Sequence, residues 1–278
     1  TGKAVPQGDA TLKGAVYGLY AREDIVHPDG ATGVIYKAGE QVASLTTDEK
    51  GQASVDGLYL GKYYVKEKAT VDGFVLDNEA REIDLTYRDQ DTAEVTYSAD
   101  WQNNRQKAEV EVVKKEKDSD RVLEGAVFAL CAKNDITGAD GNVILEADTV
   151  IEELATDKEG KLTFTADLPI GFEYYIKETS PAPGFATTDE TQEFTFEYEG
   201  AEKEKVSYSF TFEDEPTVIE ITKTSLTDGK ELEGAKLQVT DESGKVVDSW
   251  ISGKEAHIIK ELVVGQKYTL TETKPADG

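Results

Sequence analysis

The chain repeats itself at a spacing of about 111 residues, and this repeat constrains the fold more than any other feature. The segment LKGAVYGLY (12–20) returns as LEGAVFALC (123–131) and again as LEGAKLQV (232–239). Gly14 and Gly125, in the first two copies, are 111 positions apart. Internal repetition of this kind indicates that one structural unit recurs along the chain. We therefore expect consecutive copies of one domain rather than a single large core.

Apolar and polar residues alternate within each copy, with Gly and Asp turn signals between the runs. The alternating runs are EVTYSADW (94–101), AEVEVVKK (108–115), KLTFTADL (161–168), EFTFEYEG (193–200), KVSYSFTFED (205–214) and TVIEITKT (217–224). A period of two is typical of strands with one buried face. The pattern therefore predicts an all-β chain of tandem antiparallel β-sandwiches. The longer insertions at 22–42 and 132–154 have room for short helical turns.

The repeat divides the chain into three units, expected at 1–104, 105–215 and 216–278. No Gly/Ser-rich or Pro-rich linker separates them, so we expect the units to follow one another closely in a stiff rod. The third unit ends after its GQKYTLTET strand, whereas units one and two continue for 36 further residues beyond the equivalent glutamate. We therefore expect the third unit to lack its C-terminal strands and the chain to be part of a longer protein.

The charge balance excludes several classes of partner. The chain has 30 basic and 56 acidic residues, a net charge of −26. Such a field repels phosphate backbones and anionic lipid surfaces, which argues against nucleic-acid binding. No apolar run approaches the roughly 20 residues that a membrane-spanning helix needs, so no membrane insertion is expected in this segment. The simplest interpretation of the acidic residues is a well-hydrated exterior.

Metal or cofactor binding is not expected. The acidic loop NDITGADGN offers the candidate calcium ligands Asp135, Asp140 and Asn142. It lacks the alternate-position spacing and the terminal bidentate glutamate of a calcium loop. Cys131 lies among apolar residues and is expected to be a buried free thiol. His27 and His257 have no cysteine or histidine neighbour, so they do not make a metal site.

A glutamate and a lysine recur on faces that the alternation predicts to be buried. In GFEYYIKETSPAPGF (171–185), continuing the period of two points Glu178 inward. Each unit also has a lysine eleven positions before the first glycine of the repeated LxGA segment. The equivalent residues in the three units are Lys3, Lys114 and Lys223 for the lysine, and Glu67, Glu178 and Glu272 for the glutamate. Because a buried ammonium group is costly unless it is paired, the recurrence predicts lysine–glutamate pairs.

A third group follows from the same spacing. Asn103, near the end of unit one, corresponds to Asp214 in unit two. Burial lowers the pKa of a lysine and raises the pKa of a glutamate. A neutral amine can then attack the side-chain carbonyl while a protonated glutamate polarises it and transfers protons. The sequence therefore predicts an internal Lys–Asn or Lys–Asp isopeptide bond, formed with loss of ammonia or water.

The ordered set VxVxK, LxGAxF, TTDxxG, LxxGxYYxKE, PxGF and a final Asn or Asp resembles the Cna B-type, or SpaA-like, domains of Gram-positive surface proteins and pilins. The resemblance covers the whole chain, as two complete units and one incomplete unit. It implies prealbumin-like seven-stranded sandwiches, and internal isopeptide bonds that a glutamate promotes.

The resemblance assigns the site residues by position. It implies Lys3, Glu67 and Asn103 in unit one, Lys114, Glu178 and Asp214 in unit two, and Lys223 with Glu272 in unit three. Unit one departs from the family pattern in its ATVDGF loop, which lacks the usual proline. Asn104 adjoins Asn103 and stays open as an alternative acceptor. Asp214 replaces the commoner asparagine.

Three functions compete. The first is a stalk or adhesin segment of an extracellular, cell-wall-anchored bacterial protein, with further domains of the same chain as neighbours. The second is a receptor for a host matrix protein, immunoglobulin or glycan, in which the inserted loops and Tyr20, Tyr36 or Tyr59 would make the contacts. The third is an enzyme, against which stands the absence of GxSxG and HExxH. We expect the glutamates to act once, on their own chain.

Overall fold

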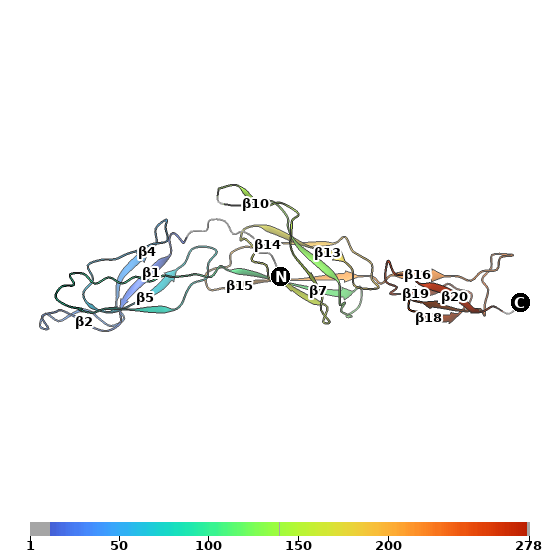
Figure 1. Ribbon diagram of the computed structural model, residues 1–278, viewed down its shortest axis with the longest axis horizontal. Helices are drawn as coiled ribbons and strands as arrows, with labels where there is room; N and C mark the ends of the chain where they lie inside the picture. Colours follow the sequence, from blue (N-terminus) through green and yellow to red (C-terminus); the bar gives the residue numbers. More distant parts are fainter. Residues whose placement is uncertain (1–11, 139, 277–278) are drawn as a thin grey trace.

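The computed structural model describes residues 12–138 and 140–276, and strands are the only regular elements in these ranges. Three groups of strands follow one another along a long axis, with unit one in blue, unit two in green and unit three in red (Figure 1). No helix in the described ranges is long and apolar enough to cross a membrane. The all-β, tandem architecture expected from the repeat is confirmed.

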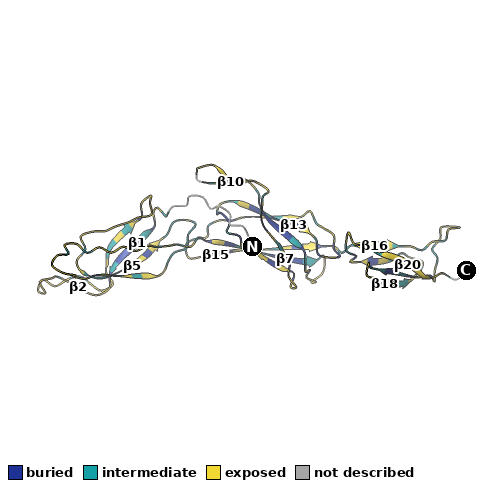
Figure 2. Cartoon of the chain, in the orientation of Figure 1, coloured by how far each residue is buried: buried dark blue, intermediate teal, exposed yellow. Residues whose placement is uncertain are grey.

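Unit two shows the complete arrangement, in which two sheets enclose one core. The first sheet has the order β11-β8-β13-β14 and the second β12-β7-β15. Their bounds are β11 (Val150–Ala155), β8 (Val127–Ala132), β13 (Glu173–Ser180), β14 (Thr191–Thr195), β12 (Lys161–Phe164), β7 (Lys107–Glu116) and β15 (Lys205–Asp214). Buried aromatic and aliphatic side chains from both sheets fill the space between them, as the dark segments of Figure 2 show. Alternate side chains of β7 are buried, so the period of two in its sequence determines which face meets the core.

The strands β7 and β15 pair in parallel, whereas all other ladders among the described strands are antiparallel. The first and the last strand of unit two therefore run side by side in the same direction. Residue alternation is the same in parallel and antiparallel strands, so the sequence pattern does not distinguish them. The consequence is that the C-terminal ends of β7 and β15 meet.

Unit one has the sheet order β4-β1-β5-β6 and a separate hairpin, β2-β3. The bounds are β1 (Val16–Ala21), β2 (Ile25–Val26), β3 (Val34–Tyr36), β4 (Gln41–Thr46), β5 (Gly61–Ala69) and β6 (Ala80–Leu85). The strand predicted at 94–101 is wrong, because this segment forms no backbone ladder among the described residues. An alternating pattern supplies a buried face, but a strand also needs a partner for its backbone groups.

Unit three pairs β16 with β19 and orders a second sheet as β18-β17-β20. The bounds are β16 (Val218–Ile221), β17 (Lys236–Thr240), β18 (Val246–Ile251), β19 (His257–Lys260) and β20 (Thr269–Lys274). Its buried core is small and centres on Val239, Ile259 and Leu262. All of β20 is exposed, in contrast to the equivalent strand β13 of unit two.

The insertions at 22–42 and 132–154 contain two-stranded hairpins instead of the helical turns that we expected. In unit two the hairpin is formed by β9 (Ile136–Thr137) and β10 (Val143–Leu145), and it projects from the side of the rod (Figure 1). Asp24 accepts a hydrogen bond from the backbone N–H of Ala38, and Asp135 accepts one from that of Ala147, both at 2.8 Å. These carboxylates close the bases of the hairpins, which favours strand pairing over a helical turn.

The units are joined by a loop that follows the repeated glutamate in units one and two. In unit two, Phe185 bridges to Pro216, and Gly184 accepts a hydrogen bond from the backbone N–H of Thr217 at 2.9 Å. Across the same joint, Arg121 binds Glu261 of unit three through two hydrogen bonds of 2.5 and 2.9 Å. Unit one repeats the backbone part of this arrangement 111 residues earlier, so the loop is a built-in connection between neighbouring units.

Gly184 has a specific role in that joint, which gives a testable expectation. Its φ is +88°, and a Cβ atom there would lie 2.8 Å from the backbone oxygen of Glu261. We expect Gly184→Ala to destabilise the joint by roughly 1–3 kcal/mol, because both the left-handed backbone and the contact oppose a side chain. Calorimetry, with hydrogen exchange at the Thr217 and Glu261 amides, measures the loss.

Gly73 is the matched control for this substitution, because it is the equivalent residue of unit one. Its φ is +92°, but the nearest neighbour of an added Cβ would be Ile170 Cδ1 at an ordinary 3.7 Å. Gly73→Ala therefore carries the backbone cost without the clash. Equal losses in the two variants would contradict the idea that Gly184 is required for close approach of unit three.

Candidate cross-linking sites

Lys114 lies at the centre of the best-formed candidate site. It is on β7, where its side chain follows Ala108, Val110 and Val112 on the buried face, as the alternation predicts. Its ammonium group lies 5.5 Å from the centre of the Phe128 ring on the opposite sheet. A cation over an aromatic face is favourable, but one ring does not replace the water that the ammonium group has lost.

Two carboxyl groups supply the missing partners. Lys114 Nζ lies 2.5 Å from Asp214 Oδ1 and 3.1 Å from Glu178 Oε1. Asp214 ends β15, the strand parallel to β7, while Glu178 reaches the lysine from β13 in the facing sheet. None of the three side chains has exposed surface. The structure thus brings together all three residues that the sequence predicted for unit two.

The parallel pairing of β7 and β15 explains why the lysine and the aspartate meet. Phe212 pairs with Lys114, and Asp214 lies one alternation further along the same face of β15. An antiparallel partner would place the opposite end of the last strand beside Lys114. The ladder also fixes both side chains relative to each other, since residues on neighbouring strands are only about 5 Å apart.

Burial changes the acid–base behaviour of Glu178. Removal from water raises the pKa of Glu178, and the nearby Lys114 opposes this rise in part. The backbone N–H of Thr188 donates a hydrogen bond of 3.3 Å to Glu178 Oε2. A carboxyl group with a raised pKa holds a proton more readily, which suits it to transferring protons inside the core.

The arrangement is compatible with amide-bond formation. The lysine nitrogen is already in contact with the carboxyl group of Asp214, so little movement is needed for attack on its carbon. Glu178 contacts the same nitrogen and can carry a proton between the reacting groups. The surrounding side chains exclude water, which prevents hydration of the amine.

Unit one repeats the glutamate and acceptor parts of this site, with Asn103 at the position of Asp214. Glu67 is buried on β5, and its Oε2 accepts hydrogen bonds of 2.7 Å from Asn103 Nδ2 and from the backbone N–H of Asp77. Asp77 and Thr188 are 111 positions apart and hold their glutamates in the same way. This backbone donor was not predicted, although the repeat spacing points to it. Lys3 lies outside the described residues.

Asn103, rather than Asn104, faces the glutamate. Asn103 Nδ2 also donates a hydrogen bond of 3.0 Å to the backbone oxygen of Val75. A carbonyl oxygen only accepts, so this contact assigns the nitrogen end of the amide. Asn104 is exposed, and its backbone oxygen accepts from the N–H of Val75. The geometry therefore favours Asn103 among the two alternatives that the sequence left open.

Unit three differs from the prediction. Lys223 and Glu272 are 3.4 Å apart, but about a third of each side chain is exposed. The expectation that Glu272 is buried is wrong, because β20 is solvent-exposed along its whole length. No described strand of unit three pairs with β16 as β15 pairs with β7. An exposed ion pair of this kind contributes at most about 1 kcal/mol.

The other residues singled out in the sequence have structural partners. Asp140 accepts hydrogen bonds from Asn142, and across residues 12–138 and 140–276 no group of three His, Cys, Asp or Glu residues could hold a metal ion. Cys131 is buried, which raises the pKa of its thiol. His257 lies 2.8 Å from Asp248. His27 packs edge-on against the ring of Tyr59.

Two of the three tyrosines considered as ligand anchors are used in packing. Tyr20 stacks on Tyr64 with ring centres 5.0 Å apart, and Tyr36 packs against the core of unit one. Tyr59 is 40% exposed. Tyr20 and Tyr36 therefore have structural roles in unit one.

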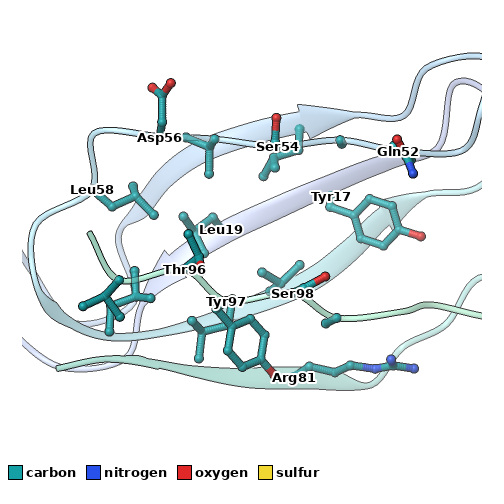
Figure 3. Close-up of a pocket in the computed structure, with 18 of the residues that line it drawn as sticks. Tyr17, Leu19, Gln52, Ser54, Asp56, Leu58, Arg81, Thr96, Tyr97 and Ser98 are labelled. Atoms are coloured by element: carbon teal, nitrogen blue, oxygen red, sulfur yellow. The ribbon is translucent and has the colours of Figure 1, made fainter. Parts of the chain in front are cut away.

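A cavity of about 1200 Å³ lies inside unit one, between its sheet and the extended segments 51–58 and 92–101. Tyr17 lies toward one end of it and Leu58 toward the other (Figure 3). In unit two, β7 runs between the corresponding segments, β12 and β15. The lining is therefore that of a sandwich core rather than that of a ligand pocket.

Comparison with protein families identifies the repeated unit. The model of the SpaA prealbumin-like fold domain matches residues 3–101, 108–210 and 217–278. The chain belongs to this family. Its three SpaA-type domains account for the repeat spacing and for the shared position of the candidate sites. The family resemblance predicted from the sequence motifs is confirmed.

Solved structures similar to this chain include one with a comparable fold. The Bacillus anthracis TIE protein is 25% identical with a TM-score of 0.53, and the match covers 95% of this chain but 43% of that protein. A streptococcal ancillary pilin is 20% identical, with a TM-score of 0.33 and coverage of 96% and 86%. The major pilin BcpA of Bacillus cereus is 18% identical, with a TM-score of 0.38 and coverage of 96% and 85%. A search of curated proteins found no match.

Proposed function

We propose that this chain is a non-enzymatic stalk segment of a bacterial surface protein, a pilin or an adhesin, whose SpaA-type domains cross-link themselves. The observation that carries the proposal is the fully buried contact of Lys114 with Asp214 and Glu178. Three ionisable groups in one core are expensive to bury. Formation of a neutral amide between Lys114 and Asp214 would remove two of the charges. Cross-linking therefore explains an arrangement that a contribution to stability alone does not.

The proposed reaction in unit two balances as a condensation. Glu178 transfers a proton from the lysine nitrogen to the Asp214 carboxyl group, which converts the ion pair to a neutral amine and acid. The nitrogen attacks Asp214 Cγ, the new C–N bond forms, and the C–O bond breaks. Glu178 then takes a second proton from the nitrogen and gives it to the leaving hydroxyl, which departs as water. In unit one the neutral Lys3 amine would attack Asn103 Cγ and the amide C–N bond would break. Glu67 would move a proton from the attacking nitrogen to the leaving nitrogen, which departs as ammonia.

We place the domain limits where the repeat puts them, at 1–104, 105–215 and 216–278. The two proposed cross-links fit the first two domains, since each bond would join the start of a domain to its end. A stalk carries load along its axis, and the joint loops and the rod-like order of the units suit that use (Figure 1). An extracellular location, wall anchoring and connection to further domains are part of the same proposal. Host-ligand binding through the hairpins is a separate alternative, tested by pull-down against matrix proteins, immunoglobulins and glycans.

Intact mass tests the cross-links directly. We expect a deficit of about 17 Da for a Lys–Asn bond and about 18 Da for a Lys–Asp bond, from the stoichiometry of condensation. Lys3→Ala should abolish the first deficit, and Asp214→Ala the second, when peptides from each domain are measured separately. Lys158→Ala, at an exposed lysine, is the control and should change neither. An unmodified mass would exclude the cross-links and leave the fold unaffected.

A further inference from the structure

The aromatic pair beside the site differs between unit one and unit two. In unit two, Phe128 and Phe212 pack with ring centres 4.9 Å apart. In unit one, Tyr17 and Trp101 occupy the equivalent positions, 111 residues earlier, with ring centres 5.1 Å apart. The geometry is thus retained, but unit one adds a phenol hydroxyl and an indole N–H. Burying a polar group in a core costs free energy unless the group forms a hydrogen bond.

Strand register places Tyr17 opposite the glutamate. Tyr17 on β1 is the direct cross-strand partner of Glu67 on β5, just as Phe128 is the partner of Glu178. Side chains of such partners are close neighbours. Tyr17 is buried, and burial together with the charge and hydrogen bonding of Glu67 raises the pKa of Tyr17 to about 12. The phenol therefore keeps its proton at neutral pH and is a donor.

The oxygen atoms of Glu67 show what the donor is needed for. Oε2 already accepts from Asn103 Nδ2 and from the backbone N–H of Asp77. Oε1 is buried and accepts no hydrogen bond from the residues that the structure describes. In unit two the matching oxygen, Glu178 Oε1, lies 3.1 Å from Lys114. The tyrosine is the polar group that faces the Glu67 carboxyl group from the adjacent strand.

We propose that Tyr17 is a positioning residue for cross-linking in unit one. Its hydroxyl holds the Glu67 carboxyl group in the rotation that keeps Oε2 on the amide nitrogen of Asn103. That nitrogen is the atom that leaves as ammonia, so Glu67 Oε2 is the group that must deliver a proton to it. Unit two does not need the hydroxyl, because its acceptor is a carboxyl group that already contacts the lysine. The proposal rests on the cross-linking function proposed above.

Neighbouring contacts hold the tyrosine in place. The guanidinium group of Arg81 lies 4.1 Å from the centre of the Trp101 ring and 3.8 Å from the Asp77 carboxylate. Arg81 thereby fixes Trp101, and Trp101 packs against Tyr17. Arg81 and Tyr17 lie at the same end of the unit one cavity in Figure 3. A ring fixed on one side leaves the hydroxyl little freedom, which is what positioning a carboxyl group requires.

The first test is the rate of bond formation in Tyr17→Phe. The full chain is made by cell-free synthesis and quenched in denaturant at intervals, and peptides containing Asn103 and Asp214 are weighed. We expect Tyr17→Phe to slow the loss of about 17 Da in unit one roughly tenfold, the effect of a hydrogen bond to a charged group. The unit two reaction in the same molecules should keep its rate. Tyr20→Phe, on the same strand, is the matched control and should alter neither.

The second test does not need the bond. In a Lys3→Ala background, NMR follows the titration of the Tyr17 phenol, whose pKa is expected at about 12. Glu67→Gln should lower the pKa of Tyr17 toward the ordinary tyrosine value of about 10. An unchanged Tyr17 titration, or an unchanged unit one rate in Tyr17→Phe, would overturn the positioning role. If the unsubstituted chain shows no mass loss in unit one, the cross-linking function itself fails there, and the role of Tyr17 fails with it.

Discussion

Glu178→Gln is expected to leave unit two folded but without its cross-link, and therefore much less stable. The bond would join Lys114 to Asp214, which are 100 positions apart. By analogy with a disulfide that closes a loop of this length, its loss costs roughly 4–5 kcal/mol of chain entropy. For one domain this corresponds to a fall in melting temperature of roughly 15–30 °C. Calorimetry measures the fall, and intact mass should rise by about 18 Da relative to the cross-linked chain.

Glutamine keeps the shape of the side chain, so the loss would report chemistry rather than a cavity. Glu193→Gln is the matched control, since Glu193 lies on the same sheet and pairs with Lys133 at the surface. Its removal should cost no more than about 1 kcal/mol. A Glu178→Gln chain that retains the mass deficit would show that the glutamate is not required. One that loses the deficit with no change in stability would show that the bond does not constrain the domain.

Much of this site could be predicted because its residues obey a local rule. Lys114 and Glu178 both occupy positions that an apolar period of two assigns to the core, and both are buried. The constant spacing then identified Asp214 as the equivalent of Asn103, and the structure places Asp214 against Lys114. Periodicity fixes which face a residue lies on, and repetition shows that an unusual residue on that face is not accidental.

What the sequence did not reveal depends on pairing between distant strands. The parallel register of β7 and β15 has no local signature, since both arrangements require the same alternation. The segment 94–101 alternates as a strand should, yet it has no ladder in the described structure, and Glu272 alternates inward yet is exposed on β20. In each case the neighbouring strand, rather than the segment itself, decides the outcome.

The difference between Tyr17 and Phe128 could be seen in the repeat, but its meaning could not. Both are large aromatic residues on a buried face, and packing alone explains either. The cross-strand register with Glu67 and Glu178 distinguishes them, because it pairs a tyrosine with the glutamate of unit one and a phenylalanine with that of unit two. A polar substitution within a repeat therefore becomes informative only once its partner is known.

Lys114→Met is expected to have the largest effect of any single change, because it removes the bond and leaves the Asp214 and Glu178 carboxyl groups buried without the lysine nitrogen that contacts them. Leaving a buried ion pair half complete costs roughly 3–5 kcal/mol in addition to the lost cross-link. The cost should depend on pH. Burial raises the pKa of Glu178 and Lys114 opposes that rise, so removing the lysine raises the pKa further.

The sign follows from linkage. A carboxyl group whose pKa is higher in the folded than in the unfolded state binds its proton more tightly when folded. Its contribution is fully present below the unfolded value of about 4.5 and is lost as the pH rises through the folded pKa. Urea unfolding of Lys114→Met should therefore give a lower free energy of unfolding at pH 8 than at pH 5, by roughly 1–3 kcal/mol. The triple variant Lys114→Met, Glu178→Gln, Asp214→Asn lacks all three charges and should show no such slope. Equal stability of Lys114→Met at the two pH values would mean that the carboxyl groups reach water once the lysine is gone. Lys114 would then be required to keep the site closed to water.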